Sequence, residues 1–161
     1  MKKMIKGILM GIMVAILSVS PVMAAVNDEV LNTAESRQVE VRIYDRRGNW
    51  IADGMLSISN PRNGKIGIYM TTQCHVAVDE IQMDIAVEQY DASIKDWRQV
   101  DYLSYNFTPQ SGKNLTEATV DFQLSGHPAN QTYRLQGWHT VFVNGSFEDL
   151  ESTTGSVLIT D

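Results

Sequence analysis

An alternation of apolar and polar residues with a period of two constrains the fold of this chain more than any other feature. The clearest example is EIQMDIAVEQYD, residues 80–91, in which Ile81, Met83, Ile85 and Val87 alternate with mostly polar residues. Because successive side chains of a β-strand point to opposite faces, this segment is predicted to be a strand with one buried face. Further strands are predicted at residues 39–45, 55–59, 65–71, 97–107, 117–124 and 132–143, and in a last segment that includes residues 156–160.

Turn-forming residues separate the predicted strands. The segments NPRNG (60–64), SGKN (111–114) and SGHPAN (125–130) are typical of turns, and Asn144-Gly145 is the pair that type I′ hairpin turns prefer. No segment after residue 24 joins a helix-capping pattern to a helical period of adequate length. About seven short antiparallel strands with this spacing predict an all-β fold, either a two-sheet sandwich or a barrel, and the sandwich fits better.

The first 24 residues have the pattern of a secretory signal peptide. Three lysines precede an apolar run at residues 8–19, Pro21 breaks that run, and Val22 and Ala24 fit the small-residue rule for signal peptidase. A membrane anchor is the alternative because the uncharged stretch is long, but the helix breaker and the small residues favour cleavage. We therefore expect a secreted, extracellular protein with no membrane attachment after cleavage. A flexible lead-in at residues 25–36 and a single β-sandwich domain at residues 37–161 would follow the signal peptide.

The charge balance argues against two classes of partner. The chain has 13 basic and 19 acidic residues, and the predicted leader holds three of the lysines and no acid. The mature chain would carry 10 basic and 19 acidic residues, a net charge of −9. Nucleic acid and anionic membrane surfaces both attract basic proteins, so neither is an expected partner.

The segment TYRLQGWHTVFVNG, residues 132–145, resembles strand F of immunoglobulin-like and fibronectin-III-like domains. In those domains a tyrosine lies two residues before a core position and forms the tyrosine corner, and here Tyr133 precedes Leu135. Together with NGKIGIYMTT (63–72) and VDEIQMDIAVEQYD (78–91), it is similar to small secreted immunoglobulin-like proteins of Gram-positive bacteria. The resemblance implies an immunoglobulin-like sandwich in which the Tyr133 hydroxyl binds backbone near residues 125–130. It carries no assigned function, and the paired cysteines of antibody domains are absent.

The sequence lacks recognisable catalytic and metal-binding motifs, so we expect no enzyme activity, no cofactor and no metal site. There is no Gly-x-Ser-x-Gly elbow, phosphate-binding glycine loop or His-Glu-x-x-His motif. Cys74 and His75 are adjacent, but neighbours in a strand point to opposite faces, so a thiol–imidazole dyad would need His127 or His139. We expect Cys74, the only cysteine, to be buried and inert, and His139 to lie at the edge of the core with one nitrogen satisfied.

A group of aromatic residues carries the strongest indication of function. If residues 80–91 and 132–143 lie in one sheet, then Tyr90, Arg134, Trp138 and Phe142 share its outward face. Rings that stack and polar groups that fix orientation are typical of a surface that binds carbohydrate or peptide, so these four are the candidate ligand-binding residues. The same face would carry Gln82, Asp84, Glu88, Gln136 and Thr140. Two alternatives are that Arg134 merely pairs with Glu88 or Asp84, and that a loop or a second copy of the domain covers the face.

Three functions stay open at this point. The favoured one is a secreted non-catalytic binding or interaction domain, monomeric or weakly dimeric, whose partner is an unknown protein or glycan. The second is a structural or assembly subunit of the cell envelope, joined through sheet edges. The third and least favoured is a hydrolase whose site the sequence does not reveal.

Overall fold

The computed structural model describes residues 38–39 and 48–161. The predicted signal peptide at residues 1–24, the lead-in at 25–36 and most of the predicted strand at 39–45 lie outside the described residues. The described part of the chain holds no helix, and so no helix long and apolar enough to cross a membrane. Its strands are β1 (Gln38–Val39), β2 (Ile51–Ser59), β3 (Ile66–Val78), β4 (Glu80–Asp91), β5 (Asp96–Phe107), β6 (Leu115–Leu124), β7 (Gln131–Val143), β8 (Ser146–Thr153) and β9 (Val157–Ile159).

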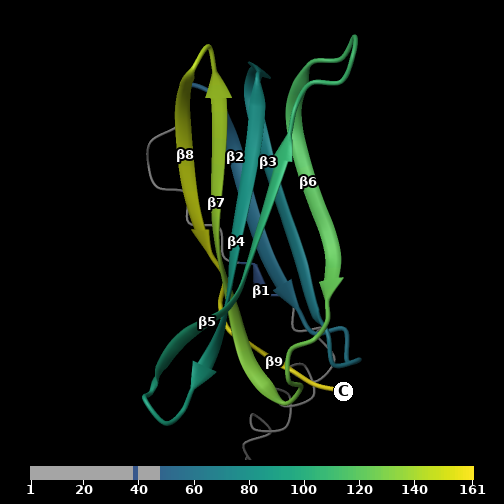
Figure 1. Cartoon of the computed structure of the whole chain (residues 1–161), viewed down its shortest axis with the longest axis vertical. Helices are drawn as coiled ribbons and strands as arrows, with labels where there is room; N and C mark the ends of the chain where they lie inside the picture. The colour runs from purple at the N-terminus through teal and green to yellow at the C-terminus, as the bar shows by residue number, and fades with distance from the viewer. Residues whose placement is uncertain (1–37, 40–47) are drawn as a thin grey trace, which may run out of the picture. The chain divides into compact units, whose positions relative to one another are not determined.

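The strands form two antiparallel sheets (Figure 1). One sheet has the order β1-β2-β3-β6 and the other β5-β4-β7-β8, with β9 paired to β7 beyond the end of β8. The chain therefore crosses between sheets after β3, β5 and β6. In immunoglobulin nomenclature, β2, β3 and β6 take the places of strands A, B and E, and β5, β4, β7 and β8 those of C′, C, F and G. The predicted all-β, two-sheet sandwich is confirmed.

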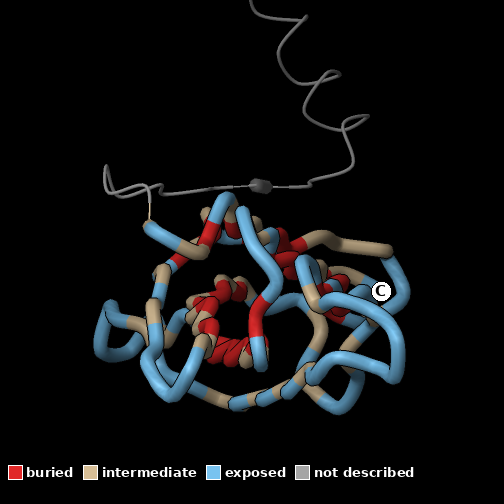
Figure 2. The backbone as a smooth tube through the Cα atoms, turned by 90° about the horizontal axis from the view of Figure 1, so that it is seen from above, coloured by how far each residue is buried: buried red, intermediate tan, exposed pale blue. Residues whose placement is uncertain are grey.

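The core fills the space between the two sheets, and Figure 2 shows the buried residues gathered in the interior of the domain. In β4 the predicted alternation is confirmed, because Ile81, Met83, Ile85 and Val87 are all fully buried. Full burial of one such side chain contributes roughly 1.5–3 kcal/mol, so this single strand is a large part of the driving force. Other deeply buried apolar side chains are Leu56, Ile58, Ile66, Ile68, Met70, Leu135 and Val141.

The outward side of β4 departs from the simple pattern. Asp84 is only 7% exposed and Ala86 only 2%, although both point away from the core. In the sheet register Asp84 lies opposite Trp138 of β7, and Ala86 lies opposite Tyr102 of β5. Since large side chains on neighbouring strands can cover small ones between them, the middle of this face is sheltered from solvent.

Two local predictions about β7 are confirmed. The Tyr133 hydroxyl donates a hydrogen bond of 2.7 Å to the carbonyl oxygen of Pro128, which is the tyrosine corner. At the other end of the strand, Asn144 and Gly145 have φ angles of 51° and 76°, as a type I′ turn requires. The strand expected after this hairpin divides into β8 and β9, with residues 154–156 between them.

His139 corrects the sequence prediction. It lies inside the core and not at its edge, and both of its ring nitrogens have partners. Nδ1 lies 2.8 Å from the Thr72 hydroxyl of β3, and Nε2 lies 3.0 Å from the Ser152 hydroxyl of β8. Burial lowers the pKa of His139 to about 4, so the ring is neutral at pH 7. The sequence could not show this because the Thr72 hydroxyl comes from the opposite sheet, on a strand 67 residues away in the chain.

Candidate binding face

The four candidate residues lie on one face, the outward side of the β5-β4-β7-β8 sheet, which we call the outer face. Tyr90 comes from β4, and Arg134, Trp138 and Phe142 come from alternate positions of β7. The sheet register places Arg134 opposite Glu88. The three β7 residues are spread along the strand, so the outer face divides into two ends and a middle.

At one end, Arg134 is held by the protein's own side chains. Its Nε donates a hydrogen bond of 2.6 Å to the Glu88 carboxylate, and its guanidinium lies 4.4 Å from the centre of the Trp97 ring. Tyr90 packs edge-on against Trp97, with 5.4 Å between the ring centroids. The alternative in which Arg134 pairs with Glu88 is therefore confirmed. The charge of Arg134 is therefore balanced by Glu88, and this pair leaves no unpaired charge for a ligand at this end of the outer face.

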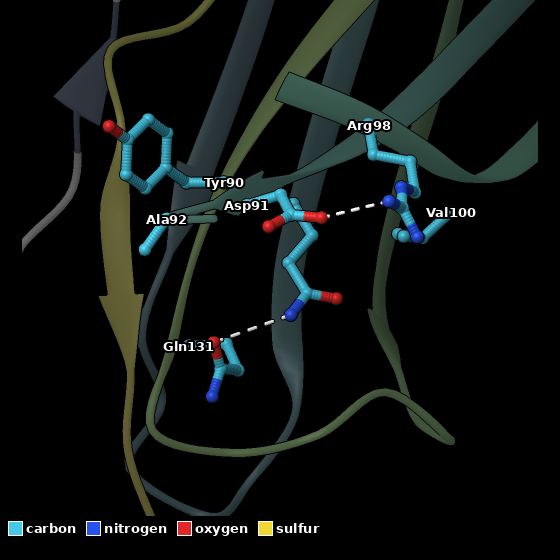
Figure 3. Close-up of a pocket in the computed structure, with 7 residues that line it drawn as sticks. Tyr90, Asp91, Ala92, Arg98, Val100 and Gln131 are labelled. Carbon is cyan, nitrogen blue, oxygen red and sulfur yellow. Dashed lines mark hydrogen bonds and ion pairs between the residues drawn. The ribbon is translucent and has the colours of Figure 1, made fainter. Parts of the chain in front are cut away.

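Tyr90 also borders a pocket of about 270 Å³ beside the β4–β5 hairpin (Figure 3). Its polar groups are paired with one another. Arg98 forms an ion pair of 2.8 Å with Asp91, and the Gln89 amide donates to Gln131 at 3.3 Å. None of the residues that line this pocket has a buried side-chain nitrogen or oxygen without a hydrogen-bond partner.

At the other end, Phe142 packs against Phe147 of β8. The ring centroids lie 6.3 Å apart and the planes are tilted by 46°. Phe147 is 66% exposed and is the most exposed large apolar side chain of the described residues. This end of the face therefore presents an apolar rim to solvent.

Between the two ends is an open hollow of about 560 Å³, which we call the hollow. Its walls include Trp138 and Tyr102, with ring centroids 6.4 Å apart, and Tyr102 is 51% exposed. Phe147 adds a third aromatic side chain from β8. The residues that line the hollow are Asp84, Tyr102, Trp138, Thr140, Phe147 and Asp149.

Asp84, one of the residues that line the hollow, has a carboxylate oxygen without a hydrogen-bond partner in the described part of the chain. Asp84 Oδ2 accepts a hydrogen bond of 2.8 Å from the Gln82 amide, whereas Oδ1 is buried and has no hydrogen-bond partner among the described residues. Burial raises the pKa of the Tyr102 phenol, and the nearby Asp84 carboxylate raises it further, first through its negative charge and then through a hydrogen-bonding contact with the Tyr102 hydroxyl. The tyrosine therefore lies close to Asp84, but its hydroxyl does not meet Oδ1 in hydrogen-bond geometry.

The hollow is acidic as well as aromatic. Asp84 and Asp149 line it, and no Lys, Arg or His is among its lining residues. Next to it, Trp138 donates its indole N–H to Glu151 at 3.3 Å, which holds the indole ring beside β8. No group of three or more His, Cys, Asp or Glu side chains in the described residues is placed to hold a metal ion. Aromatic rings beside carboxylates can attract an organic cation.

Two residues of the hollow were not predicted from the sequence. Tyr102 of β5 lies opposite Ala86, and Phe147 of β8 lies opposite Phe142. The signal for Phe147 was present, because it follows the predicted Asn144-Gly145 turn and pairing across a hairpin is set by the turn. The pairing of β5 could not be placed from sequence, because a register shift interrupts it between Val87 and Glu88.

Cys74 is half-buried against the core and not fully buried as predicted. Burial, and then the negative charge of Glu148, raise the pKa of its thiol to about 11. Glu148 is fixed in place by hydrogen bonds from the backbone N–H groups of Trp50 and Ile51. Since the thiolate is the reactive form, this thiol is unreactive at neutral pH.

Comparison with protein-family models, with curated proteins and with solved structures found no match to this chain.

Proposed function

We propose that this chain is a secreted, non-catalytic binding domain that uses the hollow on its outer face to hold a ligand. One observation carries the proposal: Asp84 keeps a buried carboxylate oxygen without a partner under a group of exposed rings. An unsatisfied buried acceptor costs about 1–3 kcal/mol, more when it is charged. Such departures from good packing are expected at functional sites, where a ligand supplies the missing contact.

The aromatic side chains support the same interpretation. Single exposed rings are ordinary on a protein surface, but Tyr102, Trp138 and Phe147 come from three strands and gather around one hollow. Aromatic walls provide stacking area, and a few polar groups provide orientation, which is the composition of a binding site. The ligands to be tested are proteins and glycans.

Assembly through sheet edges is the second candidate. Strand β5 has 12 residues and only one hydrogen-bonded neighbour, β4, among the described strands. A long edge of this kind can pair with a strand of another chain. Sedimentation of the protein at increasing concentration tests this candidate, because Ser104→Pro on the edge strand β5 should block such assembly.

Substitution of Trp138 by alanine tests the binding function. Because Trp138 lies on the outer face, the variant should unfold within about 0.5 kcal/mol of the original protein and lose binding on arrays of glycans and peptides. The matched control is Ile94→Ala, which removes an exposed apolar side chain at the tip of the β4–β5 hairpin. A loss of stability of about 3 kcal/mol or more would instead mean that Trp138 is a packing residue.

Secretion is tested at the amino terminus. Amino-terminal sequencing of protein from the culture medium should give Ala25 as the first residue, because cleavage is expected after Ala24. An intact leader on membrane-bound protein would contradict the proposed location.

A further inference from the structure

We propose that the hollow recognises a lysine side chain of a protein partner, with the lysine ammonium bound to Oδ1 of Asp84. The inference rests on the proposed binding function and names the chemistry of the ligand. It follows from three features of the hollow: its charge, the single free oxygen of Asp84, and the aromatic rings that line it.

Charge complementarity requires a cation. Two carboxylates, Asp84 and Asp149, line the hollow, and none of its lining residues is basic. Arg134, which lies on the same outer face, is already paired with Glu88 and stacked on Trp97. A bound cation would give the buried Asp84 charge the partner that the protein does not supply.

The shape of the acceptor selects an ammonium group. Oδ2 of Asp84 is occupied by Gln82, so only one oxygen is free. Arginine binds carboxylates best through both oxygens at once, whereas the ammonium of lysine is a compact charge that needs one. A metal ion such as calcium would need six or more oxygen ligands, and the described residues contain no suitable group.

The depth of Asp84 selects a lysine over an amino sugar. Asp84 is 7% exposed, Trp138 lies opposite it on β7, and the Tyr102 ring of β5 lies 6.4 Å from the Trp138 ring. A lysine ammonium extends on four methylenes that can lie along the two rings, and the rings also attract the cation itself. The amine of a sugar is attached directly to a bulky ring, which would have to enter between the two side chains. Phe147, at the rim of the hollow, would contact an apolar residue next to the lysine in the partner protein.

The test uses Nα-acetyl-L-lysine N-methylamide as the probe. It is titrated into the ¹⁵N-labelled protein while the indole N–H resonance of Trp138 is followed by NMR. We expect a saturable shift of this resonance, and about tenfold or greater weakening when the lysine Nε is acetylated, because acetylation removes the charge. Glucosamine at the same concentrations should leave the resonance unchanged.

Variants locate the interaction. Asp84→Asn should weaken binding of the probe about tenfold or more without unfolding the protein, since the amide keeps the shape and removes the charge. Tyr102→Leu is the second variant: it leaves Asp84 intact, removes one ring, and should also weaken binding. The matched control is Asp121→Asn, an exposed carboxylate on β6 of the other sheet, which should change the affinity by less than about twofold.

The outcomes separate this inference from the proposed function. Equal binding of the acetylated probe, tighter binding of glucosamine, or full binding by Asp84→Asn would each overturn the lysine assignment. If no probe shifts Trp138 while a Trp138-dependent ligand is found on the arrays, the lysine assignment fails and the binding function stands. If neither experiment finds a ligand, both fail.

Discussion

At the scale of single residues, two buried polar side chains show how differently this domain satisfies its polar groups. His139 has a hydroxyl partner for each ring nitrogen, one from each sheet. Asp84 has a partner for only one of its oxygens. A satisfied network of this kind stabilises the core around His139, whereas the half-satisfied carboxylate costs stability unless a ligand completes it. His139 is therefore a structural residue, and Asp84 is the residue on which the proposed binding function rests.

The burial of His139 predicts a pH dependence of stability. The pKa of a histidine in the unfolded chain is about 6.5, and that of folded His139 is about 4. Between these pH values the unfolded chain binds more protons than the folded protein. The free energy of unfolding therefore decreases as the pH falls from 6.5 towards 4. His139 alone should lower the free energy of unfolding by about 2 kcal/mol between pH 7 and pH 5.

Urea denaturation at both pH values measures this change. The variant His139→Gln cannot titrate, so it should be less stable at pH 7 but should lose about 2 kcal/mol less than the original protein between pH 7 and pH 5. Equal losses in the two proteins would assign the pH dependence to carboxylates elsewhere.

At the scale of elements, strands were predictable where their determinants are local. The limits of β4 at residues 80 and 91 follow from its alternation, and the type I′ turn follows from Asn144-Gly145. The hollow was only partly predictable, because its walls come from β4, β5, β7 and β8. Which residues face one another across strands depends on register and on the register shift in β5, and these are fixed by contacts between distant segments.

The tyrosine corner is an element-scale feature that can be measured. Tyr133→Phe removes the part-buried hydrogen bond from the Tyr133 hydroxyl to the Pro128 carbonyl, so it should lower the free energy of unfolding by about 1 kcal/mol or somewhat more. The matched control is Tyr105→Phe, since the Tyr105 side chain packs against Phe122 and its hydroxyl has no hydrogen-bond partner in the described residues. A Tyr133 variant as stable as the control would show that the corner orders the loop without stabilising the domain.

At the scale of the whole domain, the two sheets pack closely because each has a glycine where the other has a bulky side chain. A Cβ atom on Gly137 of β7 would lie 3.0 Å from Leu56 Cδ2 and 3.3 Å from Met70 Cε, both on the opposite sheet. A Cβ atom on Gly54 of β2 would lie 2.7 Å from Leu150 Cδ2. Packed sheets are usually about 10 Å apart, and glycines at these positions let large side chains fill the core without separating the sheets.

This reciprocal packing predicts coupling between the sheets at Gly137. Gly137→Ala should lower the free energy of unfolding by about 1–3 kcal/mol, because the added methyl group crowds Leu56 and also lies 2.9 Å from the Ser152 hydroxyl. Leu56→Val alone should cost about 1 kcal/mol by removing buried methylene volume. In the double variant the shorter valine makes room for the alanine methyl, so the total loss should be smaller than the sum of the two single losses by about 0.5 kcal/mol or more. Thermal and urea unfolding of all four proteins measures this. Strictly additive losses would mean that glycine is required at this position by Ser152, which lies in the same sheet. The facing sheet would then not be the cause.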